Sequence, residues 1–532
     1  MKGRYDFSHC THILSDSTAS IEQKLQCLDT YKEKGSIHHI GFLFPLLKSK
    51  FLKVPFLSVQ PSEFQVKVAN VIKHILQRQK ITAGSYEFLR YLYILPADIN
   101  KYKCSFPTES YHALLMLASM NCDGYVREAA VRELALTKQP EAIPYILLRL
   151  GDWVGQVRNA ANSAIQSFKE EQFAYHLLHN MSLIEWLLKV GKVKYSAVHT
   201  ELIQFLLSQE YTFEWHKQIQ RIPDHARVIY IYHLLQSGKI TPEIAHRILT
   251  DKSHLVRLAL LKNIHLLEES LHKDLLKAFL YDTSSEVRST ALQRIGTFKN
   301  ELRPDIWSLI ADTSATVRQF ARYELKNADV SFPQIYRQQI HRQHQLTGSL
   351  LGLSETGTKE DIGVCELYLQ HESSSVQLAS LIAISMLDAE VARKYALQFL
   401  SHPSSKLRKR SIEILAGYVN NDILTYAREL FLSGNEIYRK TILLLFSKEG
   451  GWRVLGDLLT GLMDKDIIVQ EQTWVYLDKW VRKASTLYAV ADPVDLERAR
   501  GIYQSFNTSK LEVTSQREQI WERLHFYLWR QI

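Results

Sequence analysis

The feature that most limits what this chain can fold into is a short motif that recurs at a nearly constant spacing. Each copy has an aliphatic residue, usually valine, followed in most copies by arginine. Nine copies are recognisable: Val126, Val157, Val256, Val287, Val317, Val376, Leu407, Ile437 and Val469. Successive spacings are 31, 99, 31, 30, 59, 31, 30 and 32 residues, so one period is about 31 residues. A repeat of this length indicates a stack of identical supersecondary units rather than a single globular core.

Two positions ahead of the motif mark the start of a helix. Three residues before the aliphatic residue stands a side chain whose oxygen can accept an amide hydrogen of the first helical turn. Seven of the nine copies have such a residue: Asp123, Ser253, Ser284, Ser314, Ser373, Ser404 and Asp466. Five residues before the aliphatic residue stands an acid or a polar substitute: Asp152, Asp251, Asp282, Asp312, Asp464, Asn121, His371 and His402. Each copy therefore predicts a turn that leads into a helix.

A third position lies on the helix itself. Four residues after the aliphatic residue the side chain is short in eight of the nine copies, namely Ala130, Ala161, Ala291, Ala321, Ser380, Ser411, Thr441 and Thr473. Because positions four apart share one face of a helix, a short side chain there lets a neighbouring helix approach closely. We expect this position to be buried against the next helix of the stack.

A second amphipathic segment follows each motif and is clearest at residues 140–152. Pro140 suits a first helical turn, and Ile143, Ile146 and Leu147 share one face of the helix that follows. Each period is then a helical hairpin with apolar surface on both sides. Such hairpins are stable only when they stack on one another, so the sequence predicts an all-α fold, an α-solenoid.

The clearest copies resemble a known family of repeats. Residues 123–165, DGYVREAAVRELALTKQPEAIPYILLRLGDWVGQVRNAANSAI, are similar to HEAT repeats of the short type found in phycobilisome-lyase-like proteins. The resemblance covers the acid, the Val-Arg pair and the short residues, and it is absent after about residue 480. It implies a superhelix of HEAT-type hairpins. Because this fold carries unrelated functions, function must be argued from sites.

The pattern divides the chain into three regions. We expect residues 1–60 to form a degenerate N-terminal helical cap, residues 61–480 the HEAT-repeat solenoid, and residues 481–532 a C-terminal helical cap. Residues 170–250 keep a helical periodicity but lose the Val-Arg phase, which predicts degenerate hairpins. Residues 346–363 contain four glycines and predict an irregular loop.

The last segment of the chain is rich in aromatic residues. We expect a helix there that carries Trp521, Phe526, Tyr527 and Trp529. One interpretation is a cap that hides the outer face of the last hairpin. The other is a partner-binding helix whose exposed aromatic side chains act as anchors.

Cysteine usage and hydropathy indicate the cytoplasm. The five cysteines are far apart and form no CxxC pair, as expected of a chain in a reducing compartment: Cys10, Cys27, Cys104, Cys122 and Cys365. We expect no membrane span, because lysine or proline interrupts the most apolar stretches well before about 18 residues. The first seventeen residues also lack the apolar run of a signal peptide.

The charge pattern leaves two classes of partner open. A net charge of +9 permits binding to an acidic partner such as nucleic acid. However, most of the motif arginines follow an acid or polar residue by six positions, which predicts a structural ladder between turns and helices: Asp152, Arg158, Asp251, Arg257, Asp282, Arg288, Asp312, Arg318 and Arg408. Residues 251–345 contain 14 Lys and Arg against 11 Asp and Glu, and this near balance does not predict a strongly positive surface that would attract nucleic acid.

Enzymes built on HEAT repeats have signatures that this chain lacks. A deoxyhypusine-hydroxylase-like di-iron site needs four His-Glu pairs, and only His371-Glu372 is present. The segment His9-Cys10-Thr11-His12 offers metal ligands but has no second cluster at zinc spacing. The order Gly357-Thr358-Lys359 does not fit a phosphate-binding loop, and no nucleophile elbow occurs.

We therefore predict a non-enzymatic scaffold that binds a protein partner through the surface of the solenoid, with its second helices lining a concave face. It should have no catalytic residue, no cofactor and no metal site. The alternative is a nucleic-acid-binding HEAT protein, with an alkylpurine-DNA-glycosylase-like enzyme as its catalytic form. Mixed charge around apolar patches would favour the protein partner, and a continuous positive groove lined by Trp and Tyr would favour nucleic acid.

Overall fold

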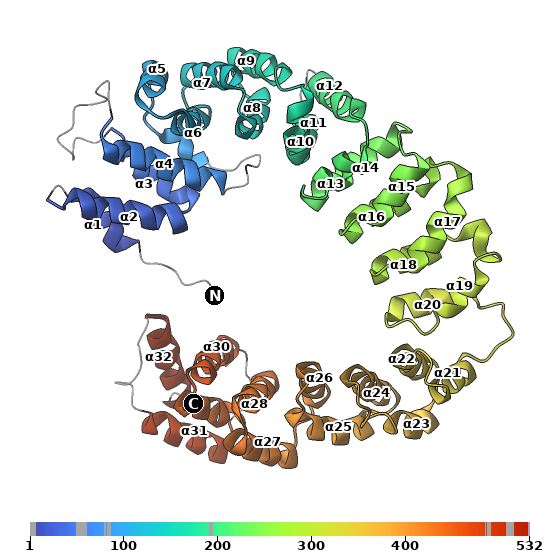
Figure 1. Ribbon diagram of the computed structural model, residues 1–532. Helices are drawn as coiled ribbons and strands as arrows, with labels where there is room; N and C mark the ends of the chain where they lie inside the picture. Colours follow the sequence, from blue (N-terminus) through green and yellow to red (C-terminus); the bar gives the residue numbers. More distant parts are fainter. Residues whose placement is uncertain are drawn as a thin grey trace. The chain divides into compact units, whose positions relative to one another are not determined.

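The computed structural model describes residues 7–16, 18–48, 61–78, 81, 87–190, 195–484, 486, 491–506 and 515–529. These residues form α-helices and short 3-10 helices, and none of them belongs to a β-strand (Figure 1). The chain divides into two compact units, Met1–Thr290 and Ala291–Ile532. The predicted all-α fold, an α-solenoid of HEAT-type hairpins, is confirmed.

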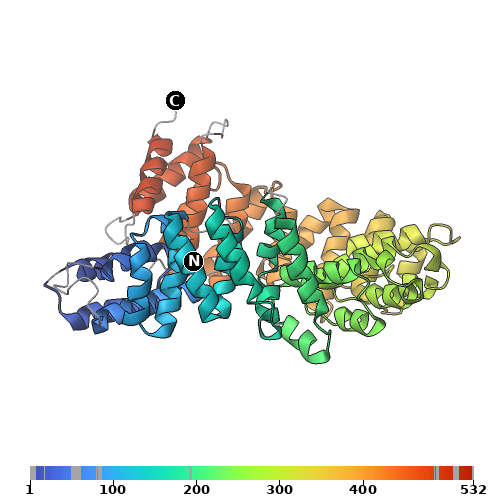
Figure 2. The same ribbon diagram turned by 90° about the horizontal axis from the view of Figure 1, so that it is seen from above.

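The first unit is a series of helices in which each hairpin packs on the next. Helix α2 packs on α4, α4 on α6, α7 on α9, α8 on α9 and α14 on α16. The helices of this unit are coloured from blue to green in Figure 2. Its helices are α1 (Ser8–Ser15), α2 (Ile21–Lys34), α3 (Ile40–Leu46), α4 (Glu63–Gln77), α5 (Pro96–Ser105), α6 (Thr108–Ala118), α7 (Gly124–Thr137), α8 (Ile143–Leu150), α9 (Gly155–Gln166), α10 (Glu171–His179), α11 (Met181–Lys189), α12 (Tyr195–Ser208), α13 (Phe213–Ile219), α14 (Asp224–Gln236), α15 (Pro242–Leu249), α16 (His254–Lys262), α17 (Glu269–Leu280) and α18 (Ser285–Gln293).

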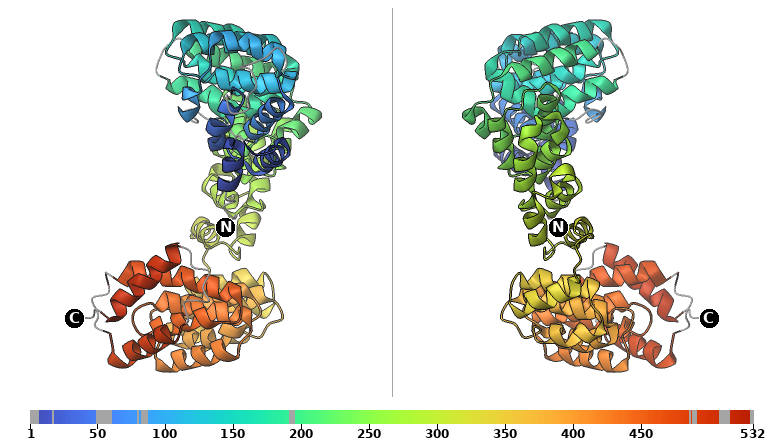
Figure 3. Two further views of the ribbon diagram at one scale, coloured as in Figure 1. Left: turned by 90° about the vertical axis from the view of Figure 1, so that its left-hand side faces the viewer. Right: turned by 90° about the vertical axis from the view of Figure 1, so that its right-hand side faces the viewer.

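The second unit begins within α18 and has the same construction. Helices α22, α24, α26, α28 and α30 form one row, and α21, α23, α25 and α27 form another (Figures 1 and 3). Its helices are α19 (Arg303–Ser308), α20 (Ala315–Glu324), α21 (Phe332–His341), α22 (Leu346–Thr356), α23 (Ile362–Glu366), α24 (Ser374–Leu387), α25 (Ala389–Gln398), α26 (Ser405–Leu415), α27 (Asn421–Ser433), α28 (Glu436–Glu449), α29 (Leu455–Thr460), α30 (Ile467–Ala484), α31 (Pro493–Ser505) and α32 (Ser515–Trp529).

The 31-residue motif corresponds to the first helix of each hairpin, and its packing is the predicted one. Val287 and Val317 are fully buried, and so are the short residues Ala291 and Ala321 one turn later. A valine and an alanine on one buried face fill the narrow space between stacked helices without overpacking it. These positions explain why the period of the sequence becomes the period of the fold.

The capping of these helices differs from the prediction in one respect. Ser253 and Ser314 stand at N-cap positions, but their side chains make no capping hydrogen bond. The acid two residues earlier binds the backbone N–H of the N-cap residue itself and so fixes the turn that precedes the helix. The Oδ1 of Asp251 accepts the backbone N–H of Ser253 at 2.8 Å, and the Oδ1 of Asp312 accepts that of Ser314 at 2.8 Å. A carboxylate accepts this bond more strongly than a hydroxyl oxygen does, because its oxygen carries charge.

The predicted irregular loop at residues 346–363 is wrong. Residues 346–356 form α22, which packs on α21 and α24, and a short 3-10 helix, η7 (Lys359–Asp361), leads into α23. The glycines serve close packing: a Cβ on Gly348 would collide with the backbone carbonyl of Ala311, and one on Gly352 would collide with the ring of Tyr336. Glycine is common in loops, but here it marks a site where neighbouring segments approach closely.

The predicted degenerate region at residues 170–250 forms helices α10–α15, and the motif returns within it at α14. Ala226-Arg227 in α14 stands 30 residues before Val256-Arg257, with alanine in place of valine. The short position four residues later is taken by Tyr230, and both Ala226 and Tyr230 are fully buried. The small and large side chains have exchanged places, so the pattern of residue types changed while the packing was kept.

The two ends of the chain are helical where the structure describes them. The N-terminal region contains α1–α3, and residues 1–6, 17 and 49–60 lie outside the described part. At the C-terminus, α31 packs on α29, and α32 packs on α30. Their roles as caps stay predictions. No helix among the described residues combines the length and the apolar character that crossing a bilayer requires.

Candidate functional site

The arginines of the motif are the first candidate site, and Arg127 shows their geometry most completely. Its Nε and Nη2 atoms donate to the two carboxylate oxygens of Asp152, both at 2.8 Å, across 25 residues of sequence. Its Nη1 atom donates to the backbone carbonyls of Asn121 and Cys122 at 2.9 and 2.8 Å. The Arg127 side chain is fully buried. The bonds to Asp152 thus join one hairpin to the next, whereas the bonds to Asn121 and Cys122 stay within the arginine's own hairpin.

The same arrangement recurs along the chain, and we call each arginine-to-acid contact between successive hairpins a rung. Arg227 contacts Asp251 at 3.0 Å, Arg257 contacts Asp282 through two bonds of 2.6 and 2.7 Å, and Arg439 contacts Asp464 at 2.7 Å. Arg318 forms its rung with Glu355 of α22. Sequence analysis missed Arg227 and Arg439, because alanine and tyrosine precede them where the motif has an aliphatic residue.

Within its own hairpin each arginine bonds a carbonyl, not a carboxylate. The Nη1 atom donates to the backbone oxygen six residues earlier in Arg158, Arg257, Arg288, Arg318 and Arg408. In Asp152, Asp251 and Asp282 the carboxylate accepts from the arginine of the preceding hairpin and from a turn amide. Thus Asp282 accepts from Arg257 with its side chain and from Arg288 with its carbonyl. The structural role that the sequence predicts for the ladder residues stays a prediction.

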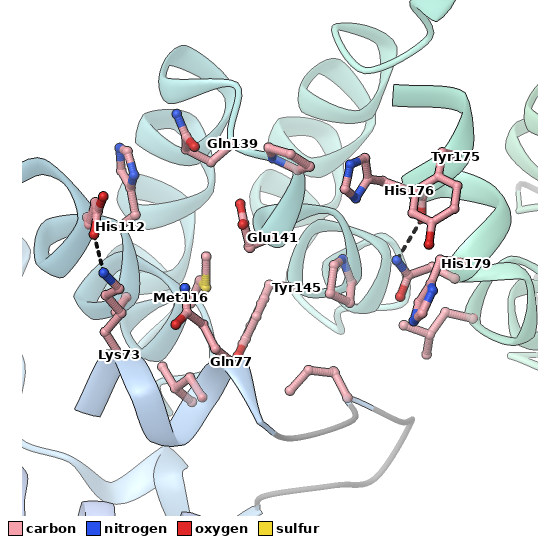
Figure 4. Close-up of a pocket in the computed structure, with 18 of the residues that line it drawn as sticks. Lys73, Gln77, His112, Met116, Gln139, Glu141, Tyr145, Tyr175, His176 and His179 are labelled. Carbon is pink, nitrogen blue, oxygen red and sulfur yellow. Dashed lines mark hydrogen bonds and ion pairs between the residues drawn. The ribbon is translucent and has the colours of Figure 1, made fainter. Parts of the chain in front are cut away.

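A pocket in the first unit is the second candidate site, and sequence analysis did not single it out. It has a volume of about 590 Å³, within the range of small-ligand pockets. Its walls come from α4, α6, α8, α10, α11 and α14, with the 3-10 helix η4 (Pro140–Ala142) at its rim (Figure 4). The lining residues are spread from Lys73 to His225, and no spacing in the sequence indicates that they meet.

The lining combines apolar, aromatic and neutral polar side chains. Among the described lining residues, Lys73 is the only lysine or arginine, and it is paired with Glu109. Burial lowers the pKa of His112 and the pKa of His176, which favours the neutral form of both imidazoles. The ring of Tyr175 meets that of His176 edge-on, with centroids 5.3 Å apart. Neutral imidazoles can donate one hydrogen bond and accept another, which suits a polypeptide ligand.

The four aromatic residues predicted at the C-terminus do not behave alike. Trp521 stacks on Tyr503 of α31 with ring centroids 4.0 Å apart, and Tyr527 meets Trp480 of α30 edge-on. Phe526 and Trp529 are 48% and 37% exposed. Trp521 and Tyr527 fit the interpretation as a cap, and Trp529 fits it in part, because its ring meets that of Tyr503 at 5.3 Å. The exposed Phe526 fits the interpretation as a docking site. Both interpretations stay predictions.

Comparison with known proteins adds a likeness in shape but no family. No family model and no curated protein matches the chain. Among solved structures, Kap121p bound to Ste12p is 13% identical, covers 98% of this chain and 68% of its own, and has a TM-score of 0.37. Importin beta in an ammonium sulfate condition is 12% identical, covers 98% and 67%, and has a TM-score of 0.33. A homology model of the AP-3 complex is 14% identical, covers 99% and 95%, and has a TM-score of 0.24.

These likenesses are too distant for any inference about what this chain binds. The HEAT-type solenoid rests on the chain's own features: stacked hairpins, buried valines and alanines, and rungs such as Arg257 to Asp282. The narrower resemblance to phycobilisome-lyase-like repeats stays a prediction.

Proposed function

We propose that the chain is a non-enzymatic interaction scaffold whose pocket in the first unit receives a segment of a protein partner. The observation that carries this proposal is the lining of that pocket. Its described residues include apolar and aromatic side chains, imidazoles and two glutamates, and the one lysine among these described residues is paired with Glu109. Mixed charge around apolar surface is typical of a site for polypeptide, because peptide groups need neutral donors and acceptors and a place for apolar side chains.

The rungs support the same proposal because they occupy the motif arginines, which nucleic-acid binding along the repeat would need. Binding to a phosphate backbone depends on free lysines and arginines that neutralise phosphates. Arg127, Arg257 and Arg318 are buried, and their guanidinium groups already bond acids and backbone carbonyls. Engaging nucleic acid through these side chains would require breaking the rungs. We therefore favour a protein partner over DNA or RNA, and the predicted cytoplasmic location stays an expectation.

The experiment places a photo-crosslinking residue in the pocket and then measures the affinity of what it captures. Gln77 is exposed at the pocket wall, so a crosslinking side chain there should not disturb the core. The captured protein is then tested against the parent chain, against Tyr175→Arg in the pocket and against Tyr323→Arg in the second unit. We expect Tyr175→Arg to weaken binding more than tenfold, which is about 1.4 kcal/mol.

Tyr323 is the matched control because it is an exposed tyrosine on a motif helix, α20, outside the pocket. Its variant should bind the partner as the parent does. Equal affinities for all three chains would remove the pocket from the proposal. A triple Arg257, Arg288 and Arg318 to alanine variant that keeps its stability but loses salt-sensitive binding to labelled DNA or RNA would establish the alternative function.

A further inference from the structure

Three side chains from three helices converge on one point in the first unit. They are Glu185 of α11, His199 of α12 and His233 of α14. The Nε2 atoms of His199 and His233 lie 2.9 and 2.8 Å from the same atom, Oε1 of Glu185. All three potential ligand atoms lie within 4.8 Å of one another. Two imidazole nitrogens and a carboxylate oxygen thus face a common centre, although they are 14 and 48 residues apart in the sequence.

The two imidazole nitrogens and the carboxylate oxygen are atoms that zinc takes as ligands in proteins. Zinc takes imidazole nitrogen at about 2.0–2.1 Å and carboxylate oxygen at about 2.0–2.2 Å, and a His₂Glu set is one of its known protein ligand sets. In a tetrahedral arrangement these bond lengths separate neighbouring ligand atoms by about 3.4 Å. The two nitrogen-to-oxygen distances would therefore open by about 0.5 Å, which small rotations of the side chains can provide.

The three side chains are partly exposed and stand on helices that are anchored in the core, which suits a metal-binding site. The side chains of His199, His233 and Glu185 are 10%, 18% and 28% exposed, so the centre is shielded but open on one side. The helices that carry them are fixed by neighbouring core residues: Ile184, Leu202 and Leu234 are at most 2% exposed. Ligands on helices anchored in a core keep their separation better than ligands on loops.

The cluster also lies where the arginine rungs are interrupted. From Arg158 to Arg227 the sequence spans more than two repeat lengths, and Arg221 is the only arginine between them. Helix α11 packs on both α12 and α14 in this stretch. An ion held by Glu185, His199 and His233 would join these three helices, as Arg257 and Asp282 join successive hairpins elsewhere.

We propose that Glu185, His199 and His233 form a zinc-binding site that cross-links α11, α12 and α14. Imidazole nitrogen selects zinc over magnesium and calcium, which prefer oxygen. Each histidine would coordinate through the lone pair of Nε2 and carry its proton on Nδ1, so coordination replaces the two hydrogen bonds to Glu185. With three protein ligands, the fourth position is left for water.

This site is distinct from the pocket, although α11 and α14 contribute to both. Helix α14 places His225 in the pocket lining and His233 in the cluster. Eight residues of helix separate the two, which is about 12 Å along the helix axis. The zinc proposal therefore does not depend on the proposed function of the pocket.

The test uses the full chain without a polyhistidine tag, freed of metal by dialysis against a chelator. Zn²⁺ is titrated in competition with a chromophoric chelator, and Co²⁺ is used as a spectroscopic probe of the ligand geometry. We expect one Zn²⁺ per chain with a Kd below about 1 µM, a rise in Tm with Zn²⁺, and visible Co²⁺ absorption typical of a four-coordinate nitrogen and oxygen site. A parent chain with no site tighter than about 10 µM would overturn the proposal.

Variants separate this site from adventitious binding to other histidines. His199→Ala with His233→Ala should abolish the tight site, and Glu185→Gln should weaken it more than about tenfold, since losing even an outer partner of a ligand costs that much. The control carries His265→Ala and His341→Ala, two exposed histidines, and should bind as the parent does. If the double variant loses its helical circular dichroism, Glu185→Gln decides. Unchanged affinity and Co²⁺ spectrum in Glu185→Gln would refute the site.

Discussion

Two regions of this chain join their helices by different chemistry. In the hairpin around α16, Arg257 contacts Asp282 through two bonds of 2.6 and 2.7 Å. Around α11, Glu185 receives two imidazoles instead. Arginine stays charged at every physiological pH, whereas histidine titrates near neutrality and can bind a metal. The region around α16 is thus joined by a guanidinium and a carboxylate, and the region around α11 by two imidazoles and a carboxylate.

The difference teaches that a repeat can keep its packing while it changes the contact that joins neighbouring units. Each rung uses one guanidinium to bond a carboxylate and the carbonyls at the start of its own helix, so it serves both sides of a hairpin. A carboxylate between two imidazoles joins three helices without reaching the turns. The second arrangement leaves partly exposed side chains at its centre, whereas the rung between Arg127 and Asp152 is fully buried.

The largest effect should come from breaking a fully buried rung. Arg127→Ala removes a guanidinium that is fully buried and leaves the carboxylate of Asp152 without its two strongest donors. Asp152 keeps its contact with Arg149 at 3.0 Å, so the loss should lie near the lower end of the about 3–5 kcal/mol that breaking a buried ion pair costs. Urea unfolding should show that loss. Arg158→Ala is the control, because Arg158 bonds backbone carbonyls and its side chain is only half-buried. If both variants lost the same free energy of unfolding, the contact between Arg127 and Asp152 would add no stability beyond that of the carbonyl bonds.

A smaller effect is expected from overfilling the space between regular helices. Ala321→Leu adds three carbons at a fully buried position that faces the next helix, which costs about 1–3 kcal/mol. Lys409→Ala, on an exposed face of α26, should change stability by less than about 0.5 kcal/mol. The measurement is the unfolding midpoint of each variant in denaturant. Equal midpoints would contradict the helix phase on which the repeat assignment rests.

The imidazole-carboxylate region should differ from the rungs in its response to acid. Hydrogen bonds from His199 and His233 lower the pKa of Glu185 to about 2. A carboxyl with a lowered pKa in the folded state contributes stability that is present above its unfolded pKa, near 4.3, and that is lost as the pH falls towards 2. With a chelator present, the parent's Tm should fall more between pH 4.5 and 2 than that of Glu185→Gln. Parallel pH curves would contradict this role for Glu185.

The smallest effect on stability should come from the exposed aromatic residues of α32. Phe526→Ala removes a side chain that is 48% exposed, so it should change stability by less than about 0.5 kcal/mol. Trp521→Ala removes the ring that stacks on Tyr503, and it should cost more. Thermal denaturation compares the two. Loss of partner binding in Phe526→Ala without loss of stability would support a docking role for this helix, and equal destabilisation would support a cap alone.

The sequence by itself determined the fold class and the phase of the regular hairpins. A valine and an alanine four residues apart lie on one apolar face of a helix, and such a face is stable when it packs against another helix. The spacing alone therefore predicts that Val287 and Ala291 are buried. The acids and arginines of the ladder are predictable for the same reason. They stand at fixed distances from that face, and local chain geometry brings them to the turn.

Only the tertiary structure decided which groups meet across hairpins. The partner of Arg257 is Asp282, 25 residues away, and the partner of Arg318 is Glu355, 37 residues away. The pocket and the Glu185 cluster likewise draw on helices that no spacing rule connects. The glycines of α22 predicted a loop wrongly, because glycine favours both turns and close helix contacts, and the choice depends on what packs against it. Local periodicity is a property of one helix, whereas these contacts depend on how helices stack, and that is decided by the packing of the whole array.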